Sequence, residues 1–204
     1  YLVISLGRHG WARWSDEHVD APPALAVVTF DDSGEIAWTD AGDWVSLGLF
    51  VVDDPLDVPA VAGLGPDPAH ESFTRAHFDA VTRGRRKQIK AVLQEQSSLA
   101  GIGNAYSDEI LHAARTSPVA LAAALDDDAL DRVFDAMLLT VRGSIAARRG
   151  IPIAELKAAK VAAMRVHGRT GEPCPVCDDD VRDVRFASTT AQYCPTCQTG
   201  GALL

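Results

Sequence analysis

The sequence has no cysteine before residue 174 and no apolar run near the roughly 18 residues that a membrane-spanning helix needs. It also lacks the basic segment, apolar stretch and small-residue cleavage site of a secretory leader. A secreted disulfide scaffold would be smaller and richer in cysteine. The four cysteines fall in two close pairs near the end of the chain, which favours a metal site in a reducing, cytoplasmic compartment.

Cations are also in deficit, because 19 Lys and Arg face 28 Asp and Glu, for a net charge of −9. This balance argues against a nucleic-acid partner, since neutralising phosphates requires cations. Residues 83–90 are a local exception, with five cations and no acid. Such a run fits either a basic stripe that binds nucleic acid or an ordinary solvated helix face, and the sequence leaves both open.

The first part of the chain has β character. Short apolar, β-branched runs at residues 2–4, 25–30, 35–38 and 47–52 predict about four strands, with a turn signal at residues 31–34. Their imperfect alternation predicts a sandwich or a sheet that is partly buried on both faces. Proline and glycine are frequent between residues 55 and 68, which predicts a linker.

Residues 72–163 have helical character. Ser72 is the expected N-cap of a first helix, and a second helix carries Ile89, Val92 and Leu93. The glycines at residues 101–103 separate it from a third helix, near residues 105–114. A fourth helix opens near residue 125 and a short fifth one covers residues 155–163. The fourth has apolar residues at helical spacing, so they are expected in the core: Leu130, Val133, Phe134, Met137, Leu138 and Val141.

The four cysteines have the spacing of a structural zinc site. Cys174 and Cys177 are separated by two residues, as are Cys194 and Cys197, with sixteen residues between the pairs. Four thiolates close the tetrahedron around one Zn²⁺ and leave no position for reactive water. The strand-like residues between the pairs predict a hairpin. Two unpaired dithiols or a redox pair is the alternative, and His167 is expected to pack or to form hydrogen bonds rather than to bind metal.

A glycine-rich turn precedes the third helix. Gly101 and Gly103 permit positive φ and close backbone approach, and the N–H groups at the start of a helix attract phosphate. Asn104 is expected to cap this helix or to donate its amide to the same phosphate. Asp108 and Glu109 are expected in the first turn, where acids are favourable. An ordinary helix junction remains the alternative for so short a motif.

Several of these segments together resemble the formamidopyrimidine-DNA glycosylase/endonuclease VIII family. The match is close over residues 96–111, which correspond to its helix-two-turn-helix motif, and extends to residues 64–68, 167–174 and 193–198. It covers residues 64–201 well and the first 60 loosely. The resemblance implies an α+β fold with three parts. These are the C-terminal part of a β-sandwich catalytic domain at residues 1–62, a helix-two-turn-helix domain at 72–163 and a four-cysteine zinc finger at 164–204.

The family resemblance implies a base-excision-repair DNA glycosylase with AP lyase activity. Such an enzyme flips a damaged, in this case oxidised, base out of double-stranded DNA, and its N-terminal proline attacks the sugar C1′ to form a Schiff base. A glutamate beside the proline and a lysine assist before β-elimination and often δ-elimination cut the strand. We expect these catalytic residues in a segment preceding Tyr1, so no catalytic residue is named in this chain.

The same resemblance implies one structural Zn²⁺, a monomer and a location with the nucleoid, without a membrane partner. The DNA contacts expected on this basis are Asn104, Arg86, Lys90 and Arg169. Two other classes remain open. One is a non-catalytic binder of damaged or abasic DNA that keeps the phosphate-gripping parts, and the other is a zinc-ribbon interaction module of another assembly.

Three departures from the family pattern concern the lesion. Thr189 occupies the hairpin position where the family has a phosphate-gripping arginine. Residues 39–44 correspond to the loop that fills the space left by the flipped base, but lack its arginine and phenylalanine. Arg8 stands where an intercalating methionine is usual, and either Arg8 or His9 could enter the duplex instead. These changes resemble a divergent, actinobacterial-type branch, whose substrate need not be 8-oxoguanine.

Overall fold

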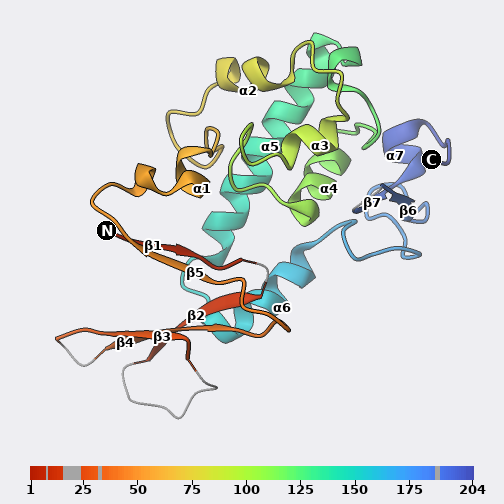
Figure 1. Cartoon of the computed structure of the whole chain (residues 1–204). Helices are drawn as coiled ribbons and strands as arrows, with labels where there is room; N and C mark the ends of the chain where they lie inside the picture. The colour runs from red at the N-terminus through yellow and green to blue at the C-terminus, as the bar shows by residue number, and fades with distance from the viewer. Residues whose placement is uncertain (8, 16–23, 32–33, 187–188) are drawn as a thin grey trace. The chain divides into compact units, whose positions relative to one another are not determined.

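A computed structural model describes residues 1–7, 9–15, 24–31, 34–186 and 189–204. The chain divides into two compact units, Tyr1–Gly63 and Leu64–Leu204, which are coloured from red to orange and from yellow to blue in Figure 1. Among the described residues, no helix is both long and apolar enough to span a membrane. The predicted division into three domains stays a prediction, since the helical and cysteine-rich parts fall within one compact unit.

The first unit contains two small antiparallel sheets. Strand β1 (Leu2–Ser5) pairs with β5 (Gly48–Val51), and β4 (Glu35–Asp40) lies between β2 (Gly10–Ser15) and β3 (Ala26–Thr29). The four expected strands are therefore confirmed, and β2 is the one that the sequence pattern missed. Its aromatic and charged residues contain no continuous apolar run, and pairing with β4 over six residues keeps it extended.

The expected linker contains two short helices. A 3₁₀ helix spans Pro55–Asp57, and α1 spans Pro59–Ala62. Both begin with proline, whose fixed φ is suited to the first helical position. The carboxylate of Asp54 accepts a hydrogen bond from the Leu56 backbone N–H at 2.9 Å, which caps the first of these helices. A proline-rich segment is thus locally ordered by proline itself.

The second unit is built around five helices: α2 (Arg75–Thr82), α3 (Ile89–Leu93), α4 (Asn104–Ala113), α5 (Asp127–Arg148) and α6 (Ile153–Ala163). These match the five expected helices, although Thr74, rather than Ser72, caps α2 through a reciprocal pair of hydrogen bonds with His77. Helix α5 packs along α4. The helices share an apolar cluster that includes these buried residues: Phe78, Ile89, Val92, Leu93, Leu99, Ile110, Leu111, Leu130, Val133 and Met137.

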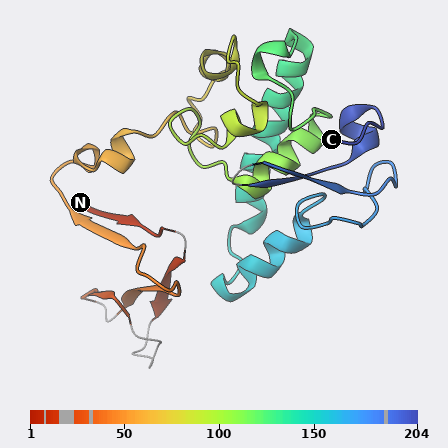
Figure 2. The same cartoon turned by 45° about the vertical axis from the view of Figure 1, so that its right-hand side comes forward.

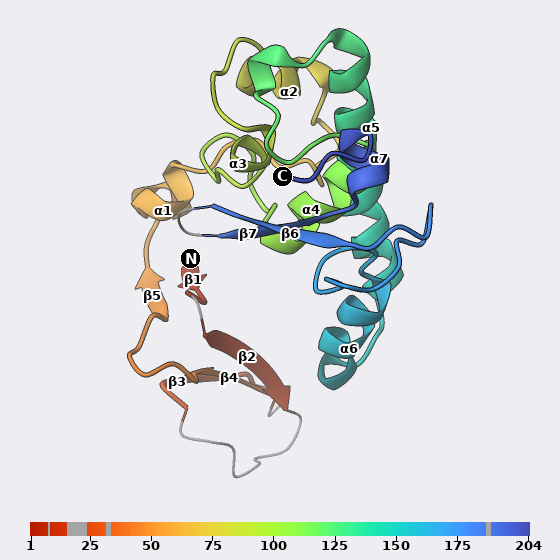
Figure 3. The ribbon, with the colours of Figure 1, turned by 90° about the vertical axis from the view of Figure 1, so that its right-hand side faces the viewer.

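The C-terminal part of this unit is a zinc-ribbon hairpin. Strands β6 (Arg182–Arg185) and β7 (Thr190–Tyr193) pair antiparallel, and the short helix α7 (Pro195–Thr199), which the sequence analysis missed, follows. Strand β7 contacts α4, and the two lie beside each other in Figures 2 and 3. Together, the two small sheets, the helical core and this hairpin confirm the predicted α+β fold. The ribbon therefore rests on the helix that follows the glycine-rich turn.

Candidate metal centre and nucleic-acid interface

The four cysteines converge on one point. Their Sγ atoms all lie within 4.8 Å of one another, and three of the separations are 3.9 Å (Cys174–Cys197), 3.3 Å (Cys177–Cys194) and 3.5 Å (Cys177–Cys197). A tetrahedral Zn²⁺ with Zn–S bonds of about 2.3 Å requires edges of about 3.8 Å. The donor set and its size fit zinc, so the chain holds one structural zinc, as its spacing predicted. No fifth donor is needed, which agrees with the expectation that His167 is not a ligand.

The surroundings of the cysteines shift the pKa values of three of the thiols. Burial raises the pKa of the Cys194 thiol and raises that of Cys197 to about 11. The backbone N–H of Asp179 lowers the pKa of Cys177. Two of these thiols therefore keep their protons at neutral pH unless a cation replaces them. Because Zn²⁺ binds thiolates, loading the site must release protons.

Asn104 sits between the glycine-rich turn and the hairpin. The turn holds Gly101 at φ +86°, and Gly103, rather than Asn104, is the N-cap of α4. The side-chain amide of Asn104 donates to the Thr190 carbonyl at 3.1 Å, while its carbonyl oxygen accepts from Gln94 at 3.0 Å. Asn104 thus ties the start of α4 to β7, and the sequence prediction of a capping role is wrong.

Asp108 and Glu109, two acidic residues of α4, hold neighbouring parts of the chain in place. They lie beyond the first turn of α4, which corrects their predicted placement, and both are buried. The carboxylate of Glu109 accepts hydrogen bonds from three consecutive backbone N–H groups, of Arg165, Val166 and His167, at 2.9, 3.0 and 2.9 Å. One carboxylate therefore fixes the chain segment that leads into the ribbon.

Asp108 contacts two nitrogen-bearing side chains from different parts of the chain. Its Oδ1 lies 2.6 Å from Lys90 Nζ, and its Oδ2 lies 2.8 Å from His167 Nδ1. The lysine is only 2% exposed, and its ammonium also donates to Ser107 Oγ at 2.8 Å and to the Asn104 carbonyl at 3.3 Å. Burial lowers the pKa of Lys90, an effect that the Asp108 charge opposes. The prediction that Lys90 contacts DNA is corrected, because its ammonium is enclosed and cannot reach a phosphate in this conformation.

The rest of the basic segment is neutralised by acids. Arg83 pairs with Asp79 and Asp127, and both Arg85 and Lys87 pair with Glu95. Hydrogen bonds from Lys87, Ser98 and Arg85 lower the pKa of Glu95 to about 2. Within residues 83–90, all of which the structure describes, Arg86 is the one cation without an ion pair, and its side chain is exposed. The basic stripe is therefore mainly an ion-pair network, with Arg86 as its available charge.

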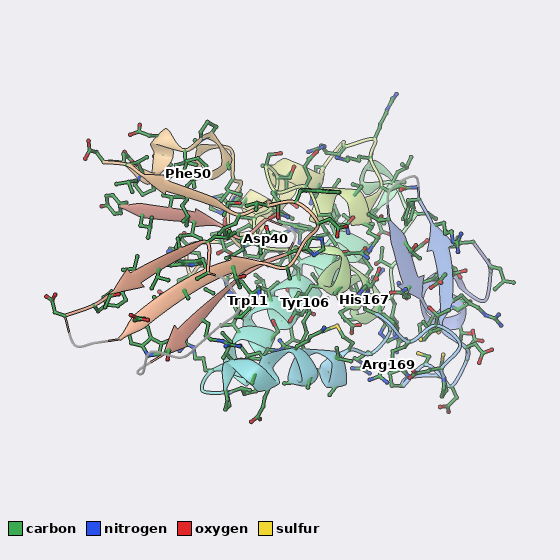
Figure 4. The ribbon with its side chains drawn as sticks, turned by 60° about the horizontal axis from the view of Figure 1, so that its bottom comes forward. Trp11, Asp40, Phe50, Tyr106, His167 and Arg169 are labelled. Atoms are coloured by element: carbon green, nitrogen blue, oxygen red, sulfur yellow. The ribbon has the colours of Figure 1, made fainter. Side chains whose placement is uncertain are left out.

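Arg169 lines a cavity at the entry of the ribbon. Its guanidinium forms an ion pair with Glu172 at 2.9 Å. The cavity measures about 480 Å³ and is also lined by Ala105, His167 and two lysines of α6, Lys157 and Lys160. Figure 4 labels His167 and Arg169 in this region. Neither lysine was predicted as a site residue, although their spacing of three residues on a predicted helix was a usable signal for one shared face.

The departures noted in the sequence have different outcomes. Arg8 lies outside the described residues, and His9 is exposed. At the end of β4, Asp40 (labelled in Figure 4) accepts hydrogen bonds from three residues of the following loop, Gly42 N, Ser46 N and Leu47 N, at 2.9, 2.6 and 3.0 Å, and these bonds lower its pKa to about 2. The held loop presents Trp44 with 75% of its surface exposed. This aromatic residue was missed as a candidate contact, although a tryptophan in a short polar loop was itself a signal.

Thr189 lies directly before β7. Its carbonyl accepts a hydrogen bond from Phe186 N at 2.8 Å, and residues 187–188 lie outside the described part of the chain. The position that carries an arginine in the resembled family is therefore a polar, uncharged residue next to the start of β7. Any phosphate contact by Thr189 would be a hydrogen bond and not a charge interaction.

Two family models match this chain. Residues 64–154 match the formamidopyrimidine-DNA glycosylase H2TH domain, and residues 171–200 match the zinc finger found in FPG and IleRS. Over 146 residues the chain is 45% identical to an uncharacterized formamidopyrimidine-DNA glycosylase-like protein of Mycobacterium tuberculosis, covering 72% of this chain and 91% of that protein. It is 33% identical to the formamidopyrimidine-DNA glycosylase of Desulfitobacterium hafniense, covering 84% of this chain and 65% of that protein.

Solved structures agree with these matches. A MutM in complex with DNA containing carbocyclic 8-oxo-G superposes with a TM-score of 0.80 at 26% identity, covering 97% of this chain and 74% of that one. The Lactococcus lactis Fpg in complex with DNA containing an abasic site gives a TM-score of 0.80 at 25% identity, with the same coverage. This chain thus spans about two thirds to three quarters of the length of these glycosylases. By its helical motif, its zinc finger and its relatives, the chain belongs to the formamidopyrimidine-DNA glycosylase family.

Proposed function

We propose that this protein is a base-excision-repair DNA glycosylase with AP lyase activity that acts on damaged, oxidised bases in double-stranded DNA. The observation that carries the proposal is the tie between Asn104, at the start of α4, and Thr190 on the zinc hairpin. This hydrogen bond joins the start of α4 to the hairpin within one compact unit, which supports the proposal that both hold the same stretch of DNA backbone. The proposal includes action as a monomer, at the nucleoid in the cytoplasm.

The start of α4 offers the means to bind phosphate. The first N–H groups of a helix have no acceptor within the helix, and the helix dipole places partial positive charge there. The side-chain amide of Asn104 has two N–H groups at the same end, and one of them donates to the Thr190 carbonyl, which leaves the other for a phosphate. The adjacent cavity supplies Lys157, Lys160 and Arg169, of which Arg169 is partly neutralised by Glu172. In this proposal Asn104 and Arg86 contact phosphates, Arg169 does so after exchanging its acid partner for DNA, and Lys90 acts only by supporting α4.

Trp44 supports the base-flipping part of the proposal. Aromatic and apolar side chains that enter a duplex replace lost base stacking, which is worth about 1–3 kcal/mol per base. Trp44 is exposed on a loop that Asp40 holds through hydrogen bonds, so little ordering is required on binding. We infer that Trp44 fills the space that a flipped base leaves. Trp44→Ala should weaken binding to abasic DNA, and the half-exposed Trp14 of β2 offers the control Trp14→Ala.

The lyase step requires an amine. In the resembled family a proline nitrogen attacks C1′ of the damaged nucleotide, the base leaves, and a Schiff base forms before the phosphate is eliminated. The proposal therefore requires this proline, with its neighbouring glutamate, in the intact gene product. The residues of the present chain bind the DNA and hold it in place.

Borohydride trapping tests the enzymatic proposal. The full-length gene product is incubated with DNA containing a single abasic site, and the reductant converts any Schiff base into a stable covalent adduct. An adduct that disappears when the intact protein's N-terminal proline is blocked or replaced supports the lyase. Absence of an adduct, under conditions where the protein binds the same DNA, refutes it.

A non-catalytic binder of damaged or abasic DNA is the second candidate. One observation favours it. The match covers 91% of the glycosylase-like Mycobacterium tuberculosis protein, so that relative contains little besides the matched region. The match covers only 65% of the Desulfitobacterium hafniense glycosylase. Thr189, in place of a charged residue at the hairpin, also fits a binder with a weakened grip on the lesion. Preferential binding of abasic over undamaged duplex, with neither an adduct nor strand cleavage, would select this alternative.

A further inference from the structure

His112 connects the helical core to the zinc site. It lies near the end of α4, is only 3% exposed, and its Nε2 is 3.3 Å from Sγ of the zinc ligand Cys174. Cys174 is itself fully buried. A buried ring nitrogen at this distance from sulfur is placed to form a hydrogen bond, for which the usual limit is longer with sulfur than with oxygen. His112 was not among the site residues predicted from the sequence.

Charge at the metal explains why such a contact matters. Four thiolates and one Zn²⁺ leave about two negative charges on the sulfurs, and buried charge is costly unless N–H donors or cations face it. His112 faces Cys174 directly. Beside it, Arg115 and Arg165 line a cavity of about 190 Å³ that also reaches Cys197. The side of the zinc site that faces α4 therefore carries one close ring nitrogen and two arginines.

The backbone at the end of α4 is arranged to keep these groups in place. Arg115 has φ +53°, a left-handed conformation that is uncommon for a residue other than glycine. It reverses the chain, so that Arg115 N donates to the His112 carbonyl at 3.1 Å and Thr116 N donates to the Leu111 carbonyl at 2.9 Å. The Thr116 carbonyl then accepts from Gln198 Nε2 at 2.9 Å.

Gln198 completes a second connection to the metal site. Its side-chain oxygen accepts a hydrogen bond from the backbone N–H of the ligand Cys194 at 2.9 Å. Each cysteine pair is thus attached to the same end of α4, one through His112 and the other through Gln198. The opposite end of α4 holds β7 through Asn104. Helix α4 therefore contacts the ribbon at both of its ends.

We propose that His112 is a positioning residue for the zinc site, and that its Nε2–H donates to the Cys174 thiolate. This bond disperses negative charge from the sulfur, strengthens zinc binding and fixes the position of the zinc site relative to α4. The inference concerns the metal and not the reaction, so it holds for a glycosylase and for a non-catalytic binder alike. Groups that orient metal ligands from outside the coordination sphere typically change metal affinity about 10–100-fold when they are removed.

Zinc affinity tests the inference. The full chain and two variants are titrated with a chromogenic chelator that competes for Zn²⁺. His112→Phe keeps an aromatic ring but removes the N–H, and should bind zinc about 10–100-fold more weakly. His112→Gln restores a side-chain N–H and should recover most of that loss. Ile110→Val, a small buried change on the same helix, is the control for altered stability and should keep native zinc affinity.

Two results of the titration would overturn the inference. One is a zinc affinity of His112→Phe within about twofold of the native value, because removing a group that orients a metal ligand typically lowers metal affinity about 10–100-fold. The other is an equal loss in Ile110→Val, because general destabilisation would then explain the effect. Cadmium NMR of the cadmium-substituted native chain, with nitrogen-labelled histidine, is independent of variant folding. A correlation between the His112 ring proton and the metal is expected through the sulfur, and its absence would exclude the hydrogen bond.

Discussion

Replacing Lys90 with methionine should destabilise the second unit strongly, because it leaves the carboxylate of Asp108 buried with one partner fewer. The lysine is 2% exposed and the side chain of Asp108 is 0% exposed. Removing one member of a buried ion pair costs about 3–5 kcal/mol. Asp108 keeps the His167 ring at 2.8 Å, so we expect the lower end, about 3 kcal/mol.

A double-mutant cycle separates the pair from its two members. Replacing both residues, as in Lys90→Met with Asp108→Leu, removes the uncompensated charge, and such apolar replacements of buried pairs are often neutral or stabilising by about 1–4 kcal/mol. The double variant should therefore be more stable than Lys90→Met alone. The measurement is urea unfolding followed by far-UV circular dichroism at saturating zinc. The exposed Arg86→Met is the control and should change stability by less than about 0.5 kcal/mol.

The reasoning about the enclosed ammonium fails if Lys90→Met costs less than about 1 kcal/mol, because the charge would then be reaching water. It also fails if the double variant is no more stable than Lys90→Met. DNA binding gives a second criterion. A phosphate contact contributes about 0.9 to the slope of log affinity against log salt, so Lys90→Met should leave that slope unchanged.

Three further predictions concern the paired acids, the free cation and the metal. The pKa of Glu95 is about 2 in the folded protein against an ordinary 4.5. Its ionised form therefore stabilises the fold fully above pH 4.5, and this stabilisation is lost as the pH falls towards 2. The difference in free energy of unfolding between the native chain and Glu95→Gln should shrink between pH 4.5 and 2 in acid titrations. Arg86→Ala should reduce the salt slope of DNA binding by about 1, and an unchanged slope would remove Arg86 from the interface. Cys194→Ser should abolish zinc binding, protease resistance of the ribbon and DNA binding together, because zinc supplies folding energy; retained affinity for DNA would make the ribbon dispensable.

Much of the fold could be predicted because its signals are local. The spacing of the cysteines is sufficient to predict the zinc site, since two-residue gaps bring both thiolates of a pair to one metal. The apolar period of α5 likewise predicted a buried face containing Val133 and Met137, and both are fully buried. In contrast, strand β2 is extended because it pairs with β4, and no periodicity inside residues 10–15 indicates that pairing.

The candidate site was harder to predict because its charges find partners far away in sequence. Lys90 belongs to a run of cations that suggested a surface, but Asp108, eighteen residues later, draws it into the core. Nothing in the sequence around His112 distinguishes it from an ordinary buried helix residue. Only the fold brings it beside Cys174, which is 62 residues away in the sequence. Single-residue types indicate which chemistry is available, while tertiary packing decides whether a charge faces DNA, an acid or a thiolate.

The three amides that converge on Glu109 have a consequence for how this protein can vary. Backbone N–H groups, and not side chains, hold residues 165–167 to α4 at this carboxylate. Any residue other than proline can supply an N–H, so the hydrogen bond at Arg165 does not depend on its side chain. The side chain at this position is therefore free to vary in what it presents at the cavity beside Cys197. The next two side chains are not free in this way, because Val166 is buried with Cys174 and Cys194 and the His167 ring contacts Asp108. Glu109 itself has no such freedom, because losing its carboxylate would leave the three N–H groups of residues 165–167 without their acceptor.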